Sequence, residues 1–124
     1  MNMPQRGDLQ SVLAEFSELP DFVGIELARV SQKGNFGNTP LHVAVIQNNI
    51  DSASALIRLG AEINAIGEAG YTPLHEAVEQ GHLGMTRFLL DSGAAKNIKN
   101  EDGLTSLQLA ESLHLDEIIE LLKI

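Results

Sequence analysis

The sequence predicts an all-α solenoid, built from stacked helix–turn–helix units with finger-like β-turn loops and a divergent N-terminal helical cap. Two observations support this fold class. Residues 34–66 align with residues 67–99 without a gap, and such self-similarity at a fixed period of roughly 20–50 residues is the signature of repeat architectures. Each unit also carries an apolar helical face that it cannot bury alone, so neighbouring units must stack.

The 124 residues divide into four parts of one domain. Residues 1–33 are expected to form the N-terminal helical cap with a divergent partial repeat. Residues 34–66 and 67–99 form two complete repeats, and residues 100–124 form a truncated C-terminal repeat.

In the N-terminal part, apolar residues recur at helical spacing and predict a helix over Leu9–Leu19, which Pro20 ends. The stretch Ala28–Ser31 matches Ala61–Asn64 in pattern, which indicates a partial repeat before Gly34.

Each repeat carries the signals of two helices. Thr39 and Thr72 stand directly before prolines, and threonine at the N-cap and proline at the first helical position are both favoured. Gly60 and Gly93 stand where a left-handed residue would end the second helix. The expected helices of the repeats are Pro40–Gln47, Asp51–Leu59, Pro73–Gln80, Gly84–Ser92 and Ser106–Leu113.

The string T-P-L-H occurs at Thr39–His42 and again at Thr72–His75, and the third unit reads T-S-L-Q-L-A. With its 33-residue period, this signature resembles the ankyrin-repeat family. The resemblance extends from residue 34 to about residue 124 and implies a protein-binding solenoid rather than an enzyme. Because His42 and His75 recur at one repeat position, we expect them to tie each repeat to the next through finger backbone groups.

The resemblance also implies where a partner would dock. Partners of ankyrin proteins usually contact the concave side, which is built from the finger tips and the exposed face of each first helix. An acidic surface with aromatic anchors suits a basic protein partner. Carried over to this sequence, the predicted partner-binding residues are Phe36, Asn38, Ile46, Glu68, Tyr71, Glu76, Glu79, Gln80, Glu101, Asp102, Leu104 and Leu113.

The charge balance favours a protein as the partner over nucleic acid. The chain has 17 acidic residues against 8 Lys and Arg, a net charge of −9, whereas phosphate binding depends on Lys and Arg. No apolar run reaches the roughly 18 residues of a membrane span. Because the chain contains no cysteine and residues 1–7 do not resemble a secretory signal, we expect a cytoplasmic protein. It is expected to be monomeric when free.

No catalytic, cofactor-binding or metal-binding residues are predicted. Glu111, His114 and Glu117 have a spacing that can place metal ligands on one side of a helix, but sites of that type need further carboxylates from other helices. Glu76 and Glu79 are expected on an exposed helix face, where nothing would raise their pKa for acid catalysis.

Two functions stay open at this point. Small acidic ankyrin proteins look like immunity partners of secreted bacterial toxins, and an acidic inhibitor could cover a cationic active site. The alternative is a non-inhibitory adaptor or assembly scaffold. The small residues Ser52–Ala55 on an outer helix could mark a close contact of that kind or only a loosely packed repeat.

Overall fold

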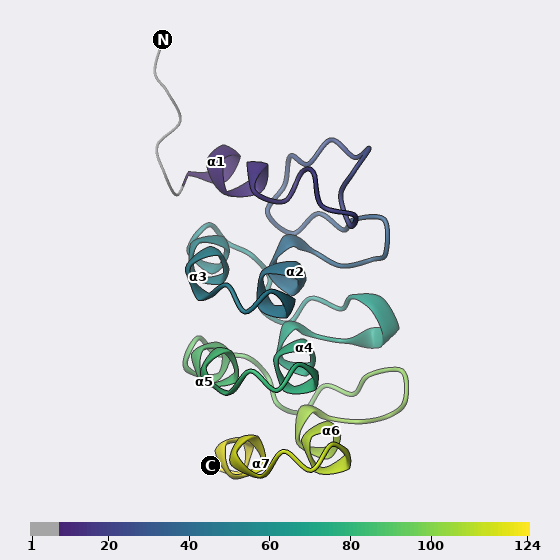
Figure 1. Cartoon of the computed structure of the whole chain (residues 1–124), viewed down its shortest axis with the longest axis vertical. Helices are drawn as coiled ribbons and strands as arrows, with labels where there is room; N and C mark the ends of the chain where they lie inside the picture. Colours follow the sequence, from purple (N-terminus) through teal and green to yellow (C-terminus); the bar gives the residue numbers. More distant parts are fainter. Residues whose placement is uncertain (1–7) are drawn as a thin grey trace.

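The computed structural model of the chain describes residues 8–124, so the polar segment 1–7 lies outside the described residues. The described chain is all-helical and contains no strand. Its helices form two columns, and loops project from one side of the stack (Figure 1). The elements are α1 (Leu9–Ala14), α2 (Pro40–Ile46), α3 (Ile50–Arg58), the short 3-10 turn η1 (Glu68–Gly70), α4 (Pro73–Glu79), α5 (Leu83–Asp91), α6 (Ser106–Ser112) and α7 (Asp116–Leu122).

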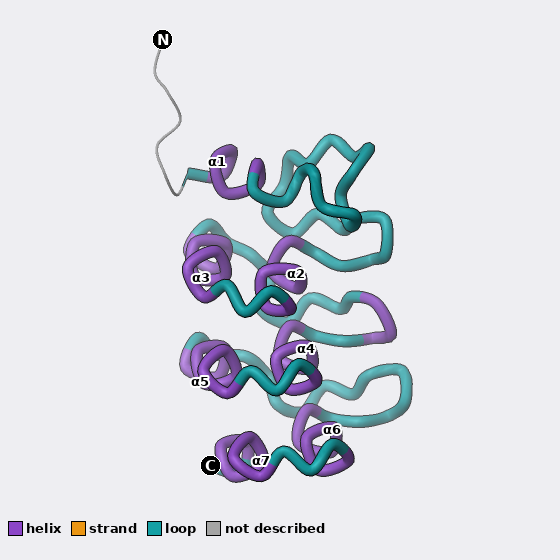
Figure 2. Tube along the Cα trace, viewed as in Figure 1, coloured by secondary structure: helices purple, strands orange, loops and turns teal. Residues whose placement is uncertain are grey.

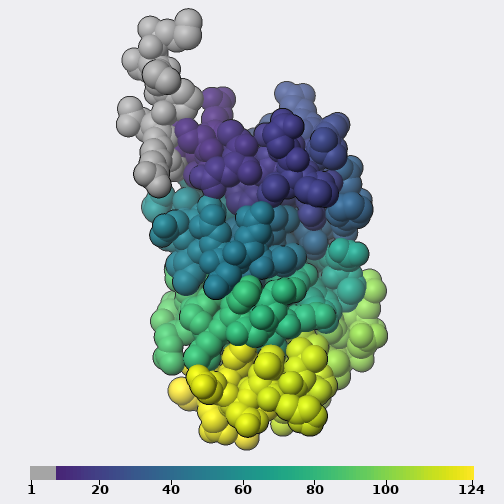
Figure 3. Space-filling view, viewed as in Figure 1, coloured from purple at the N-terminus to yellow at the C-terminus, as the bar shows by residue number. Residues whose placement is uncertain are grey.

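Each unit of the stack contains an inner helix (α2, α4 or α6) and an outer helix (α3, α5 or α7). Each inner helix packs on its own outer helix and on the inner helix of a neighbouring unit. Consecutive parts of the chain therefore lie as successive layers along the long axis (Figure 3). The predicted solenoid is confirmed, and the five helices expected in the repeats begin and end within one residue of their predicted bounds. No helix within residues 8–124 has the length and apolar character needed to cross a membrane.

The inner helices begin with a reciprocal cap. The Thr39 hydroxyl accepts the His42 amide N–H, while the Thr39 amide N–H donates to His42 Nδ1 at 3.1 Å. The same pattern recurs at α4 with Thr72 and His75 and at α6 with Thr105 and Gln108. These bonds satisfy donors that a helix N-terminus otherwise leaves free, which is why the threonine positions fix where the helices begin.

The capping histidines also connect one repeat to the next. Because Nδ1 of His42 accepts a hydrogen bond, Nε2 carries the proton and donates to the Tyr71 carbonyl at 2.8 Å. His75 donates in the same way to the Leu104 carbonyl at 2.9 Å. Burial lowers the pKa of both imidazoles, which keeps them neutral. The predicted structural role of this histidine position is confirmed.

The projecting loops, which we call fingers, are closed by their own backbone (Figure 2). The Gly67 amide donates to the Tyr71 carbonyl at 2.8 Å, and the Asn100 amide donates to the Leu104 carbonyl at 2.9 Å. A Cβ atom on Gly67 would collide with Asn38 Oδ1 and lie 2.7 Å from His42 Nε2, so only glycine permits this close approach.

The segment before α2 follows the hydrogen-bonding pattern of the repeats. The Glu62 amide donates to Ser31 Oγ, and 33 residues later the Ala95 amide donates to Asn64 Oδ1, both at 2.9 Å. Side chains at equivalent positions thus join the N-terminal segment to the first repeat and the first repeat to the second.

The N-terminal helix is shorter than predicted, because α1 ends at Ala14 rather than Leu19. Beyond Ala14 the chain tightens into turns, with amide-to-carbonyl bonds from Phe16 to Leu13 and from Leu19 to Phe16, each at 3.0 Å. This path buries both Phe16 and Phe22, whose rings meet edge to face at 6.4 Å. Burial of two aromatic side chains outweighs continued helical hydrogen bonding here.

Leu74 lies in the middle of the core and is 1% exposed. We expect Leu74→Ala to lower the free energy of unfolding by about 2–5 kcal/mol, because it removes buried methyl groups and leaves a cavity. Leu113, which is 43% exposed, provides the matched control, and Leu113→Ala should change stability little. Urea denaturation followed by circular dichroism measures both, and equal unfolding midpoints would contradict this description of the core.

Candidate protein-binding surface

Three segments of the chain bring carboxylates together beside α4. Glu76 and Glu79 lie one turn apart on α4. Glu68 comes from the finger that precedes α4, and Asp21 comes from the segment before α2. Glu79, Glu68 and Asp21 all act electrostatically on the Glu76 carboxyl. We call these four residues the acidic cluster.

Asn38 holds two members of the cluster in place. Its Oδ1 accepts the Glu68 amide N–H at 2.9 Å, and its Nδ2 donates to Asp21 Oδ2 at 3.4 Å. Asn38 was expected at an exposed finger position, but it is only 4% exposed. The finger that follows α3 lies against Asn38. The Asn38 side chain therefore supports the acidic cluster from inside the fold instead of facing solvent.

Glu76 differs most from its sequence-based expectation. It is 8% exposed rather than on an open helix face. Burial is the largest cause that raises its pKa, followed by the charges of Glu79, Glu68 and Asp21, and the result is a pKa of about 7. The expectation that nothing would desolvate this carboxyl was wrong, because Glu76 is buried in the folded chain.

Tyr71 borders the cluster from the base of the same finger. It is half-buried, not fully exposed as expected, and its ring lies 5.4 Å from the His75 ring. Burial raises the Tyr71 pKa, and the carboxylates of Glu79, Glu76 and Asp102 raise it further. The Tyr71 side chain therefore lies close to several negatively charged carboxylates.

The other predicted partner-binding residues do not all meet at this cluster. Phe36 is 53% exposed on the first finger. Ile46 and Leu104 are half-buried, while Leu113 is exposed just beyond α6. The Glu101 amide donates to the Ala69 carbonyl at 3.0 Å, which holds the third finger against the second. Five predicted acidic or polar residues are exposed in the cluster, beside it or on the third finger: Glu68, Glu79, Gln80, Glu101 and Asp102.

Sequence reasoning missed Asp21. No motif marks this residue, and its place beside Glu76 follows only from the turns that fold residues 15–24 over α2. The cluster also has no cation of its own: within residues 8–124 the one ion pair joins Lys123 and Glu120, on α7 and its C-cap.

Comparison with known protein families agrees with this geometry. The family model described as "Ankyrin repeat" matches residues 36–68, and the model described as "Ankyrin repeats (many copies)" matches residues 56–110. The chain belongs to the ankyrin-repeat family. Ankyrin repeats are non-catalytic modules of protein–protein interaction, so the chain is a protein-binding solenoid. A search among curated proteins finds no match.

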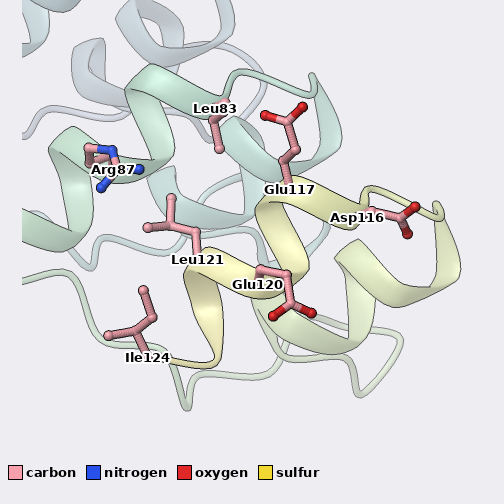
Figure 4. Close-up of a pocket in the computed structure, with 7 residues that line it drawn as sticks. All are labelled: Leu83, Arg87, Asp116, Glu117, Glu120, Leu121 and Ile124. Atoms are coloured by element: carbon pink, nitrogen blue, oxygen red, sulfur yellow. The ribbon is translucent and has the colours of Figure 1, made fainter.

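A hollow on the other side of the ankyrin stack does not gather functional groups. It lies between α5 and α7, and the carboxylates of Asp116, Glu117 and Glu120 point in different directions (Figure 4). Apolar side chains and one arginine complete its lining, namely Leu83, Leu121, Ile124 and Arg87. The hollow therefore lacks a convergent set of polar groups that would fix a ligand.

Glu111, His114 and Glu117 do not lie on one face of a single helix. His114 has a φ of 57° and lies in the turn between α6 and α7, so Glu111 and Glu117 belong to different helices. No group of three or more His, Cys, Asp or Glu in the described part of the chain could hold a metal ion.

Glu76→Gln should stabilise the ankyrin fold in alkaline solution. The carboxyl has a pKa of about 7 when folded, against 4.5 as its ordinary value. Protonation thus favours the folded state, and the stability that the proton provides is lost as pH rises from about 4.5 through about 7. We expect the variant to gain about 1–3 kcal/mol at pH 8 and much less at pH 5.

Urea denaturation at the two pH values measures this gain. Glu117→Gln is the control, because Glu117 is exposed on α7 and does not act on the Glu76 carboxyl. A gain for Glu76→Gln that is the same at both pH values would show that ionisation of Glu76 does not oppose folding.

Proposed function

We propose that this ankyrin-repeat chain binds a basic protein through the acidic surface of its second and third repeats, and inhibits that protein as an immunity protein inhibits a secreted toxin. The observation that carries the proposal is the convergence of four carboxylates from three segments of the chain without a cation to balance them.

The balance of charge explains why a basic partner suits this surface. A net charge of −9 attracts a cationic protein over a long range and speeds encounter. At short range, the acidic cluster offers negative charge that no Lys or Arg of the described chain neutralises. Positive groups of a partner would relieve the repulsion among these carboxylates, which makes the association electrostatically complementary.

Exposed residues near the cluster can extend the contact. Phe36 presents an aromatic ring to solvent on the first finger, and aromatic residues often anchor protein interfaces. Glu101 and Asp102 continue the negative surface onto the third finger. A basic catalytic site covered by such a surface would lose access to its substrate, which is the basis for proposing inhibition. The proposal places the free chain in the cytoplasm as a monomer.

The observation that favoured the adaptor alternative has another explanation within the chain. The small residues 52–55 of α3 do form a close contact, but they form it within the chain. Ser52 Oγ donates to Glu15 Oε2 at 2.6 Å, and α1 packs on α3. Ala53 and Ala55 are buried in the core. The packing of α1 therefore accounts for the small side chains without a second partner.

Charge reversal of exposed cluster residues should weaken partner binding. We expect a Glu68→Lys, Glu79→Lys double variant to lose most of the captured partner, because the reversal repels basic groups. Capture by the wild type should fall as salt rises from low to high ionic strength. The measurement is capture from native lysate on the immobilised chain, quantified by mass spectrometry across a salt series.

The matched control is a Glu117→Lys, Glu120→Lys double variant, which changes the net charge equally but on α7. If both variants retained the same amount of partner, the acidic cluster would not be the binding surface. If the captured protein kept its activity in the complex, inhibition would be wrong and the adaptor function would replace it.

A further inference from the structure

We propose that Val23 and Phe36 form a docking site on the finger side of the chain, and that this site receives an apolar side chain that lies between Lys or Arg residues of the basic partner protein. We call these two residues the apolar pair. The inference rests on the proposed function and names the part of the partner that this surface recognises.

Both members of the apolar pair are strongly exposed to solvent. Val23 is 54% exposed and Phe36 is 53% exposed, and only Ile124 exceeds them among the large hydrophobic residues within 8–124. Exposed hydrophobic side chains that occur singly are normal on soluble proteins, whereas a contiguous exposed group marks an interaction site. The meaning of this exposure therefore depends on how the two segments that carry the pair, the turns after α1 and the first finger, are joined.

Asn35 joins these two segments. Its amide N–H donates to the Asp21 carbonyl at 2.5 Å, and its Nδ2 donates to the carbonyls of Val23 at 2.9 Å and Pro20 at 3.3 Å. Asn35 directly precedes Phe36. Two side chains that both face solvent thus start from neighbouring points of the backbone, where the turns and the first finger meet at the N-terminal end of the stack (Figure 1).

The backbone around the apolar pair is fixed before a partner arrives. A Cβ atom on Gly34 would collide with the Asp21 carbonyl and lie 2.7 Å from the Phe22 ring, so the base of the first finger packs directly on the N-terminal turns. The finger itself is closed by the bond from the Gly34 amide to the Asn38 carbonyl at 2.8 Å. Because this region is already ordered, docking on it loses little conformational entropy.

Two carboxylates lie beside the apolar pair. Asp21 stands two residues before Val23 in the same turns. Glu68 lies on the second finger, and its amide nitrogen is 3.9 Å from the place that a Cβ atom would take on Gly37, the residue after Phe36. An apolar side chain with a cation on either side would therefore pack on the pair and bring its charges near both carboxylates. A segment with acidic flanks would be repelled.

The same charges argue against a second copy of the chain as the occupant. Two copies that met through their apolar pairs would bring their Asp21 and Glu68 carboxylates together, and each copy has a net charge of −9. Like charges that face each other across an interface cost affinity. Lys33, which directly precedes the first finger, forms no ion pair with either carboxylate. Both carboxylates therefore stay available to cations of a partner.

Three short peptides test the chemistry of the docking group. They are acetyl-Lys-Phe-Lys-amide, acetyl-Lys-Ser-Lys-amide, which lacks the apolar side chain, and acetyl-Glu-Phe-Glu-amide, which has the opposite charges. Each is titrated into the isotope-labelled full chain at low salt and followed by amide chemical shifts. We expect saturable shifts at Val23, Asn35 and Phe36 with the first peptide. The other two should bind at least about tenfold more weakly, because each lacks one of the two contributions.

Variants of the apolar pair test the place of binding. Phe36→Ser should weaken binding of acetyl-Lys-Phe-Lys-amide about tenfold, since removal of an aromatic anchor commonly has an effect of that size. Val23→Ser should weaken it as well and provides a second reading outside the finger. Leu113→Ser is the matched control, because Leu113 is 43% exposed but lies beyond α6. The same spectra show whether each variant is folded.

Three results would overturn the inference. The first is that the serine or the glutamate peptide binds as tightly as acetyl-Lys-Phe-Lys-amide, and the second is unchanged binding of that peptide to both folded variants of the pair. The third is that the Val23 and Phe36 shifts move with the concentration of the chain alone, which would make a second copy the occupant. If the peptides fail but partner capture still depends on Glu68 and Glu79, only the docking site is wrong. If capture ignores the charge reversals as well, the proposed function fails with it.

Discussion

The hydrogen bond from each capping histidine to the next finger is the interaction on which the rest of the molecule depends. One imidazole nitrogen closes the N-terminus of the inner helix, and the other holds a backbone carbonyl of the following repeat. The bond therefore sets the distance between neighbouring repeats and the position of each finger over its helix. Together with the bond from the Glu68 amide to Asn38, it holds Glu68 and Tyr71 in place beside α4.

These bonds hold the acidic cluster in place, although repulsion among its like charges lowers the stability of the fold. A solenoid gains its stability from repeated apolar packing between neighbours, and the core of this chain is built from leucine, valine and alanine in that manner. At one point the same packing largely buries the Glu76 carboxyl near three other carboxylates, which raises its pKa. Groups that destabilise the free protein are often those that a binding partner completes. The local conflict between folding and charge is therefore the main physical reason to place function here.

The N-terminal segment does more than cover the end of the first repeat. Its turns bury Phe16 and Phe22, and the same turns carry Asp21 to the cluster. Its Ser31 side chain accepts a hydrogen bond at the position where Asn64 accepts one in the next unit, although its sequence has diverged from the repeats. A segment that covers the end of the core thus also contributes a charge to the binding surface, and α1 explains the small residues of α3.

The sequence by itself determined the helices of the repeats, the inner caps and the tie between repeats. These features depend on local signals, since threonine, proline and histidine at fixed offsets satisfy the helix N-terminus wherever they occur. Only the tertiary structure decided which polar residues are buried. Asn38 and Glu76 look solvent-facing from helical and finger spacing, yet both are buried in the folded chain. Spacing describes one element at a time, whereas burial and pKa depend on every segment that packs against it.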